Sequence, residues 1–329
     1  MQLADNIAAE LTRSGFAIVP RRHMVELLSL AEGSGWQNFA ANWKDLPLDT
    51  FMADCGQYRR RRFATFGMQG SRIVRKPHQP HFQGRSFNRL NGGVERWFEP
   101  VGSEVAESAV TFGLLSLCRY LFGSTGIIEP MRDQHIELHQ FRIEASSDGE
   151  GYPTPEGMHR DGVDWACITM IDRNNVDGAE TRIADERGRV LATVTLAEPL
   201  DTVFFDDRRI RHGVSAIHRT DPDQAGWRDV LVTTGRHVTT SSLASNDVPL
   251  RGHESPAIRP VFSRNMSRMS LIDTYREKAS GERAAAKEAS LPNRRQVHER
   301  AAATWDRMAQ SAQDTFDQSV VNAAAKARL

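Results

Sequence analysis

The sequence predicts a mostly β core with flanking helices, an α+β fold whose strands form a barrel or a double-sheet jelly roll. Short runs of β-forming residues, separated by turn signals, follow one another between about residues 128 and 240. Helical patterns precede these runs and return in the last part of the chain. A chain of 329 residues with 40% hydrophobic composition is long enough to bury such a core.

The first part of the chain predicts helices and short strands. Its first apolar residues recur at helical spacing, namely Leu3, Ile7, Ala8 and Leu11. Gly15 ends this pattern, and the segment FAIVP that follows is typical of a strand. Residues 24–46 carry a second helical pattern, whereas residues 51–100 are dense in Arg, Gly, Asn and aromatics and predict loops and short strands. The segment VTFGLLSLCRYLFG predicts a buried helix that ends at Gly123.

Seven strand-like runs then follow, which read QHIELHQFRIEA, GMHRDGVDWACITMI, AETRIAD, VLATVTL, DTVFFDD, RHGVSAIH and RDVLVTTGR. We therefore expect one domain over residues 1–242, with its jelly-roll core at about residues 128–240. Residues 243–270 predict an irregular linker. Residues 271–329 are rich in Ala, Glu, Lys, Arg and Gln and predict a helical tail.

The tail carries an apolar stripe if it is helical from about Asn293. The stripe consists of Val297, Ala301, Trp305, Met308, Ala312, Phe316 and Val320, spaced three or four residues apart. Such a stripe requires a partner surface. The partner is either the chain's own helical layer or a second copy, which would make the protein a homodimer through its tail.

Composition restricts the classes of partner and the compartment. Lys plus Arg and Asp plus Glu both number 42, so no net charge favours nucleic acid or an acidic membrane surface. The first residues lack the features of a signal peptide, and no long apolar run predicts a membrane span, so we expect a cytoplasmic protein. Cys55, Cys118 and Cys167 are odd in number and widely spaced, which predicts reduced thiols.

The segment PEGMHRDGVDW places His159 and Asp161 two positions apart. On a strand both side chains would point to the same face, since side chains alternate with a period of two. Alone, the pair is equally typical of a polar strand face. His212 lies on a later strand-like segment, and two imidazoles with one carboxylate form the ligand set that suits non-haem Fe(II) with open coordination positions.

Several arginines are candidates for binding a carboxylate. If the open metal positions hold a 2-oxoacid, its far carboxylate needs a buried arginine, and Arg228 begins the last strand; the alternative is an exposed arginine at a strand end. Gln140 and Arg142 share a face that either points inward, to hold substrate or 2-oxoglutarate, or forms a polar outer surface. The run from Arg59 to Arg62 offers further arginines for a carboxylate-bearing substrate, but its members cannot all face one way.

Several segments resemble the bacterial 2-oxoglutarate/Fe(II) dioxygenase family that includes L-isoleucine hydroxylases. These segments are PTPEGMHRDGVDW, NNVDGAET, TVFFDDRRIRHGVSAI and WRDVLVTTG, with GFAIVP, DCGQYRRRRFATF, FNRLNGGVERWFEPV and IELHQFRIEA upstream, and together they span about residues 14–238. The resemblance implies a double-stranded β-helix of the cupin-like jelly-roll type. It implies His159, Asp161 and His212 as iron ligands and Arg228 as the partner of the 2-oxoglutarate C5 carboxylate.

The same resemblance implies that Fe(II), 2-oxoglutarate and O2 are used to hydroxylate an unactivated C–H bond of a small substrate, expected to be a free L-amino acid. Two other functions use the same residues. A cupin-type metal enzyme would work without 2-oxoglutarate and would not need Arg228. A non-catalytic jelly-roll binding protein would not need all three metal ligands.

Overall fold

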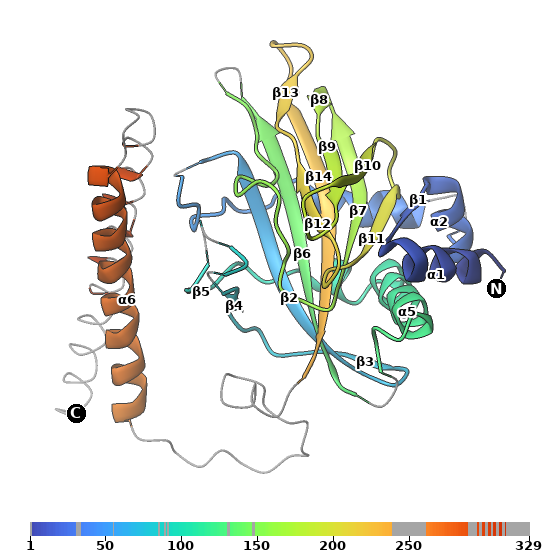
Figure 1. Ribbon diagram of the computed structural model, residues 1–329, viewed down its shortest axis with the longest axis horizontal. Helices are drawn as coiled ribbons and strands as arrows, with labels where there is room; N and C mark the ends of the chain where they lie inside the picture. The colour runs from blue at the N-terminus through green and yellow to red at the C-terminus, as the bar shows by residue number, and fades with distance from the viewer. Residues whose placement is uncertain are drawn as a thin grey trace. The chain divides into compact units, whose positions relative to one another are not determined.

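The computed structural model describes residues 2–238 except 31–33, 55, 85, 89, 91, 130–131 and 147–148, together with residues 261–288 and some residues between 295 and 313. The chain divides into two compact units. The first unit comprises Met1–Asp49 and Gln57–Asn246, and the second comprises Thr50–Gly56 and Asp247–Leu329. All of the described strands belong to the first unit (Figure 1).

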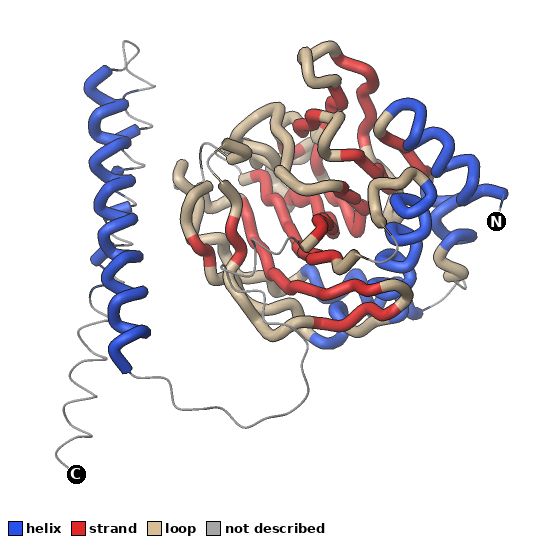
Figure 2. Tube along the Cα trace, turned by 60° about the horizontal axis from the view of Figure 1, so that its bottom comes forward, coloured by secondary structure: helices blue, strands red, loops and turns tan. Residues whose placement is uncertain are grey.

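The helices of the first unit are α1 (Gln2–Ser14), α2 (Arg21–Leu27), α3 (Ser34–Ala40), the 3-10 helix η1 (Ala41–Trp43), α4 (Ser103–Ala106) and α5 (Ala109–Ser124). The strands are β1 (Phe16–Val19), β2 (Arg59–Gln69), β3 (Arg72–Arg75), β4 (His81–Phe82), β5 (Glu95–Arg96), β6 (Gln134–Ala145), β7 (Trp165–Asn174), β8 (Val176–Gly178), β9 (Glu180–Ala184), β10 (Val190–Thr195), β11 (Thr202–Asp206), β12 (Arg211–Val214), β13 (Ile217–Arg219) and β14 (Gly226–His237). Figure 2 shows that the helices gather to one side of the strands of this unit. Among the described helices none is both long and apolar enough to cross a membrane.

The strands form a large and a small antiparallel sheet. The large sheet has seven strands in the order β1-β11-β7-β14-β6-β2-β3, and the small sheet has three in the order β10-β9-β12. Two short pairs, β13-β8 and β4-β5, complete the arrangement. Each of the seven runs predicted from the sequence contains at least part of a strand, so the predicted mostly β core is confirmed.

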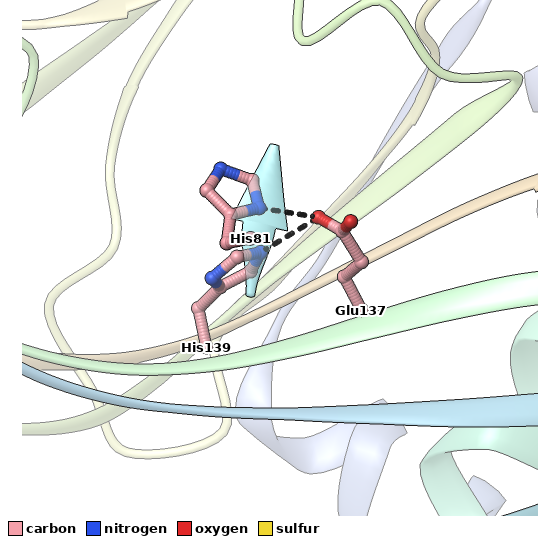
Figure 3. A group of neighbouring side chains, drawn as sticks. All are labelled: His81, Glu137 and His139. Atoms are coloured by element: carbon pink, nitrogen blue, oxygen red, sulfur yellow. Dashed lines mark ion pairs between the residues drawn. The ribbon is translucent and has the colours of Figure 1, made fainter. Parts of the chain in front are cut away.

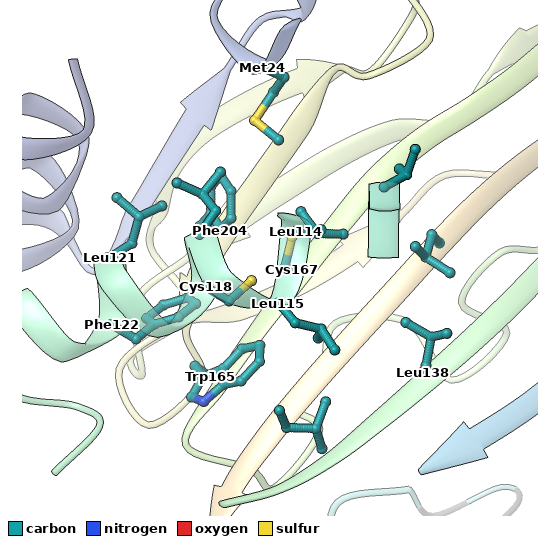
Figure 4. Close-up of a cluster of buried hydrophobic side chains, with 14 of the residues drawn as sticks. Met24, Leu114, Leu115, Cys118, Leu121, Phe122, Leu138, Trp165, Cys167 and Phe204 are labelled. Carbon is teal, nitrogen blue, oxygen red and sulfur yellow. The ribbon is translucent and has the colours of Figure 1, made fainter. Parts of the chain in front are cut away.

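The outer face of the large sheet packs against helices, which leaves the inner face to the small sheet. Trp165 and Cys167 on β7 face α5, where the ring of Phe122 stacks on Trp165 with the ring centroids 5.0 Å apart (Figure 4). The alternate residues of β7, Ala166 and Ile168, belong to a separate apolar cluster between the sheets. Cys118 and Cys167 are free and buried, as predicted, and Cys55 lies outside the described residues.

Strand β2 is the main element that the sequence pattern did not predict. We expected loops and short strands over residues 51–100, but β2 is eleven residues long and pairs with β6 inside the large sheet. Its four consecutive arginines hid the alternation of apolar and polar residues by which a half-buried strand is recognised in a sequence. Arg59 and Arg61 are buried on the inner face, whereas Arg60 pairs with Glu144 at 2.9 Å at the more exposed outer face.

The second unit contains α6 (Val261–Glu288), which begins ten residues before the predicted start of the helical tail at residue 271. Trp305 of the expected apolar stripe is 2% exposed, stacks on Tyr275 and lies under the Lys278 ammonium, which is 4.2 Å from its ring centroid. Ala302 and Ala309 are also buried. The stripe therefore contacts the chain's own helix at Trp305, and its other expected members lie outside the described residues.

Candidate active site

His159, Asp161 and His212 converge at one point between the two sheets. His159 Nε2 lies 3.5 Å from Asp161 Oδ1, and His212 Nε2 lies 3.8 Å from Asp161 Oδ2. One ligand atom from each residue lies within 4.8 Å of the others. The structure thus brings together the three residues that the sequence selected as metal ligands.

The local structure that aligns them differs from the strand we expected. Strand β7 begins only at Trp165, so His159 and Asp161 lie in the preceding loop. An isolated antiparallel bridge fixes this loop instead, because the main-chain N–H groups of His159 and His212 each donate to the other's carbonyl at 2.9 Å. The bridge places the two imidazoles side by side with their ring centroids 4.6 Å apart.

Asp207 holds the loop that carries Asp161. Its carboxylate accepts hydrogen bonds from the main-chain N–H groups of Asp161 at 3.0 Å, Gly162 at 2.8 Å and Val163 at 3.1 Å. Gly162 has φ +80°, and a Cβ atom there would collide with the ring of Phe87, so only glycine fits. Sequence reasoning missed Asp207, although the paired aspartates of VFFDD were visible in the sequence.

The three residues differ in the protonation state that their surroundings favour in the metal-free site. His159 Nδ1 lies 2.9 Å from the Gly157 carbonyl and donates to it, which leaves Nε2 free for a metal. Burial opposes a charge on His159, but its hydrogen bond to Asp161 raises its pKa to about 9. Burial lowers the pKa of His212 to about 4, whereas the two imidazoles, against the effect of burial, hold the pKa of Asp161 well below its usual range.

The donor set fits Fe(II). Two imidazole nitrogens and one carboxylate oxygen from this chain form a facial arrangement that leaves other coordination positions for small ligands. The three side chains line a cavity of about 380 Å³, a volume typical of small-molecule sites. Ile168, Val230 and Val232 line apolar parts of its wall.

Arg228 lies in the same cavity and is 2% exposed. Its Nε and Nη2 atoms are buried and have no hydrogen-bond partner among the described residues. Burial, with the nearby Arg173, lowers the pKa of Arg228 to about 10. A buried guanidinium with free donors fits a carboxylate, which it can bind with two parallel hydrogen bonds.

Gln140 and Arg142 lie on the other face of β6. The residues of this strand that line the cavity are Glu137, His139, Phe141 and Ile143. Gln140 is buried and its Nε2 donates to the Asn42 carbonyl at 3.4 Å. Arg142 forms two hydrogen bonds with Asp229, at 2.8 and 2.6 Å. The substrate role expected for Gln140 and Arg142 finds no support in this placement.

Other cavity residues escaped the sequence analysis. Arg96 comes from β5 in the segment predicted as loops, and Glu156 has one carboxylate oxygen buried without a described partner. A second cluster of His81, Glu137 and His139 also lines the cavity (Figure 3). Only Glu137 and His139 had a visible signal, because they lie two residues apart on one predicted strand.

Comparisons with known proteins agree with this geometry. A family model described as 2OG-Fe dioxygenase matches residues 40–234. The sequence is 24% identical over 155 residues to the L-isoleucine-4-hydroxylase of Bacillus thuringiensis, over 47% of this chain and 64% of that protein. The chain thus matches less than two thirds of the length of this curated relative.

Two solved structures have the same fold. A bsmA homologue from Methylobium petroleophilum PM1 is 31% identical, with a TM-score of 0.65 over 71% of this chain and 92% of that chain. The structure of IDO from Bacillus thuringiensis gives a TM-score of 0.62 at 18% identity, over 72% of this chain and 100% of that chain. The predicted jelly-roll fold with flanking helices is confirmed.

The family match also confirms the predicted enzyme class, 2-oxoglutarate-dependent dioxygenase, and the cofactors Fe(II), 2-oxoglutarate and O2, at the level of the family. It agrees with a His–Asp–His cluster and a free buried arginine in one cavity. The matched residues make up more than half of the sequence. The chain therefore belongs to the 2OG-Fe dioxygenase family.

Proposed function

We propose that this protein uses Fe(II), 2-oxoglutarate and O2 to hydroxylate an unactivated C–H bond of a free L-amino acid. The observation that carries the proposal is the unpartnered Arg228 guanidinium, buried in the same cavity as the His–Asp–His cluster. The similarity to a protein named L-isoleucine-4-hydroxylase supports an aliphatic amino acid as the substrate.

In this function His159, Asp161 and His212 hold the metal, and Arg228 binds the C5 carboxylate of 2-oxoglutarate. With O2, the bound iron and 2-oxoglutarate supply the oxidising chemistry that inserts one oxygen atom into a C–H bond and releases succinate and CO2. The chain's own contribution is to orient the substrate and to exclude water. The apolar side chains of Ile168, Val230 and Val232 support this second task.

Anaerobically purified protein loaded with Fe(II) and 2-oxoglutarate provides the direct test. We expect a panel of aliphatic L-amino acids to include a substrate that stimulates succinate release, with a product about 16 mass units heavier from one added oxygen atom. Metal-dependent turnover without 2-oxoglutarate consumption would favour a cupin-type enzyme. Failure to bind iron would favour a non-catalytic binding protein.

Two variants test the assigned roles separately. His212→Ala removes one of three ligands, so we expect loss of turnover and of most bound iron. Arg228→Lys keeps the charge but loses the two-pronged geometry, so we expect about a 10-fold or greater increase in the KM for 2-oxoglutarate with iron retained. Arg219→Lys is the control, because Arg219 donates to the main-chain carbonyls of Ala145 and Pro222. An unchanged KM in Arg228→Lys would assign the carboxylate to another residue.

A further inference from the structure

One wall of the cavity holds three buried arginines. Arg59 and Arg61 of β2 and Arg96 of β5 are 6%, 3% and 2% exposed. The carboxylates beside them are Asp49, Glu137 and Glu156. Arg59 pairs with Asp49, since its Nη2 lies 2.7 Å from Asp49 Oδ2 and its Nε donates to the same oxygen at 2.8 Å. Three guanidinium groups thus share this wall with three carboxylates, and the hydrogen-bond donors of the other two arginines decide what the wall can bind.

Arg61 and Arg96 keep free donors. The guanidinium of Arg61 is 3.7 Å from Asp49 and 3.6 Å from the centre of the Phe98 ring, and its Nε has no acceptor among the described residues. The Nε of Arg96 is likewise buried without an acceptor, and Arg96 forms no ion pair with the described part of the chain. A buried guanidinium donor without an acceptor is costly, and an anion in the cavity would supply that acceptor.

This wall is separate from Arg228. Ile143 of β6 pairs with Arg228 of β14 on one side and with Arg59 of β2 on the other. Two sheet spacings of about 4.8 Å therefore separate the Arg228 backbone from that of Arg59, and Arg61 lies one inward position further along β2. One carboxylate of 2-oxoglutarate at Arg228 leaves Arg61 and Arg96 available to another anion.

The adjoining cluster of His81, Glu137 and His139 resembles a metal site in composition (Figure 3). His81 Nδ1 and His139 Nε2 lie 2.9 and 3.4 Å from Glu137 Oε2. However, Arg61 Nη2 lies 2.6 Å from His139 Nδ1. A guanidinium can only donate, so the neutral His139 ring carries its proton on Nε2, which faces Glu137 and has no lone pair for a metal. The cluster orients Arg61 and does not offer a cation site.

We propose that Arg61 and Arg96 form a second anion subsite, which binds the free carboxylate of the substrate. Phe141 and Ile143 line the cavity beside it and suit a hydrocarbon side chain. The inference rests on the proposed function and names the residues that recognise the acid. They would select a free acid over an amide, an ester or an amino acid attached through its carboxyl group to a carrier.

The first test uses the unaltered holoenzyme, so it does not depend on a variant that folds. L-isoleucine, L-leucine and L-valine are each compared with their carboxamides, which keep the shape and lose the negative charge. Binding to the anaerobic Fe(II)–2-oxoglutarate complex is followed by visible absorption, and coupling is followed by succinate release. We expect at least one acid to bind about 100-fold more tightly than its amide.

The second test uses Arg61→Gln and Arg96→Gln, with Arg62→Gln as the matched control. Arg62 lies on the same strand but donates outward to the Asp45 carbonyl at 3.2 Å. We expect the first two variants to raise the KM for the amino acid about 100-fold, while the KM for 2-oxoglutarate and the iron content stay unchanged. The control should match the unaltered enzyme in all three quantities.

The outcomes separate this inference from the proposed function. Decarboxylation of 2-oxoglutarate in the absence of an amino acid tests the dioxygenase assignment without testing the carboxylate subsite. If it proceeds but the amides bind as well as the acids, or no acid binds, the carboxylate subsite is wrong and the dioxygenase assignment stands. The cluster of His81, Glu137 and His139 is tested with Mn(II). If the His212→Ala variant still binds Mn(II), and the further change His81→Ala abolishes that binding, this cluster is a metal site.

Discussion

His159 must be neutral at Nε2 to bind a metal, yet its neighbours favour the protonated ring. Burial disfavours the charge, but the hydrogen bond to Asp161 and the Glu156 carboxylate raise the pKa of His159 to about 9. Asp161 stays ionised, because its pKa is held well below its usual range, and burial keeps His212 neutral with a pKa of about 4. Near neutral pH the metal-free site therefore carries one proton that a metal must displace.

This competition predicts how metal affinity depends on pH. Below pH 9, each increase of one pH unit raises the fraction of His159 that is neutral about tenfold. The affinity for Fe(II) or Mn(II) should therefore rise about tenfold per pH unit and level off above about pH 9. Calorimetric titrations with Mn(II) at pH 7, in two buffers of different ionisation heat, should report about one proton released per metal. A heat of binding that is independent of the buffer would contradict the raised pKa of His159.

At the scale of elements, β6 and β14 are joined by a buried ion pair on the face away from the cavity. Arg142 and Asp229 have side chains that are 11% and 1% exposed, and Arg142 also lies over the Trp227 ring at 4.9 Å. Burial raises the pKa of Asp229 to about 6 although Arg142 lowers it, so this carboxylate depends on Arg142 to remain charged. The pair stabilises the pairing of the two central strands.

Arg142→Ala should accordingly lower the free energy of unfolding by about 3 kcal/mol, because it leaves Asp229 buried without a partner. The matched control is Arg60→Ala, which breaks a pair with Glu144 whose side chains are 37% and 35% exposed, and should cost less than about 1 kcal/mol. Urea unfolding measures both. Unchanged stability together with a raised KM for the amino acid would return Arg142 to the substrate role that its sequence position suggested.

The elements also explain which parts of the site the sequence predicts. His159 and Asp161 are two residues apart and Arg228 begins an apolar strand, but each pattern alone was ambiguous, and the order of these residues with His212 along the chain selected them. Arg61 was not singled out within the run from Arg59 to Arg62, and Arg96 was not selected, because their facing depends on the register of β2 with β6 and of β4 with β5. The sequence left open whether Gln140 and Arg142 face the cavity, because alternation pairs residues without saying which pair points inward.

At the scale of the whole molecule, the chain forms two units of unequal role. The triad, Arg228, Arg61 and Arg96 all belong to the first unit. The second unit combines the tail with Thr50–Gly56, a segment far away in the sequence. Within it Met52 and Ala53 are 2% and 1% exposed, as is typical of residues that are part of a core. Homodimer formation through the tail stays a prediction.

A chain that ends at Asn246 separates these roles. It keeps every residue proposed to bind iron, 2-oxoglutarate and substrate, so iron binding and substrate-free decarboxylation of 2-oxoglutarate should remain measurable. Solubility should fall, because Met52 and Ala53 lose the rest of their unit. The change Met52→Ser in the shortened chain should restore part of the lost solubility. Light scattering on the full and shortened chains then tests the homodimer. If the tail mediates a dimer, the full protein should have the mass of two chains, and the shortened protein should have the mass of one shortened chain. A shortened protein that folds, by circular dichroism, yet does not bind 2-oxoglutarate would place part of the cofactor site in the second unit.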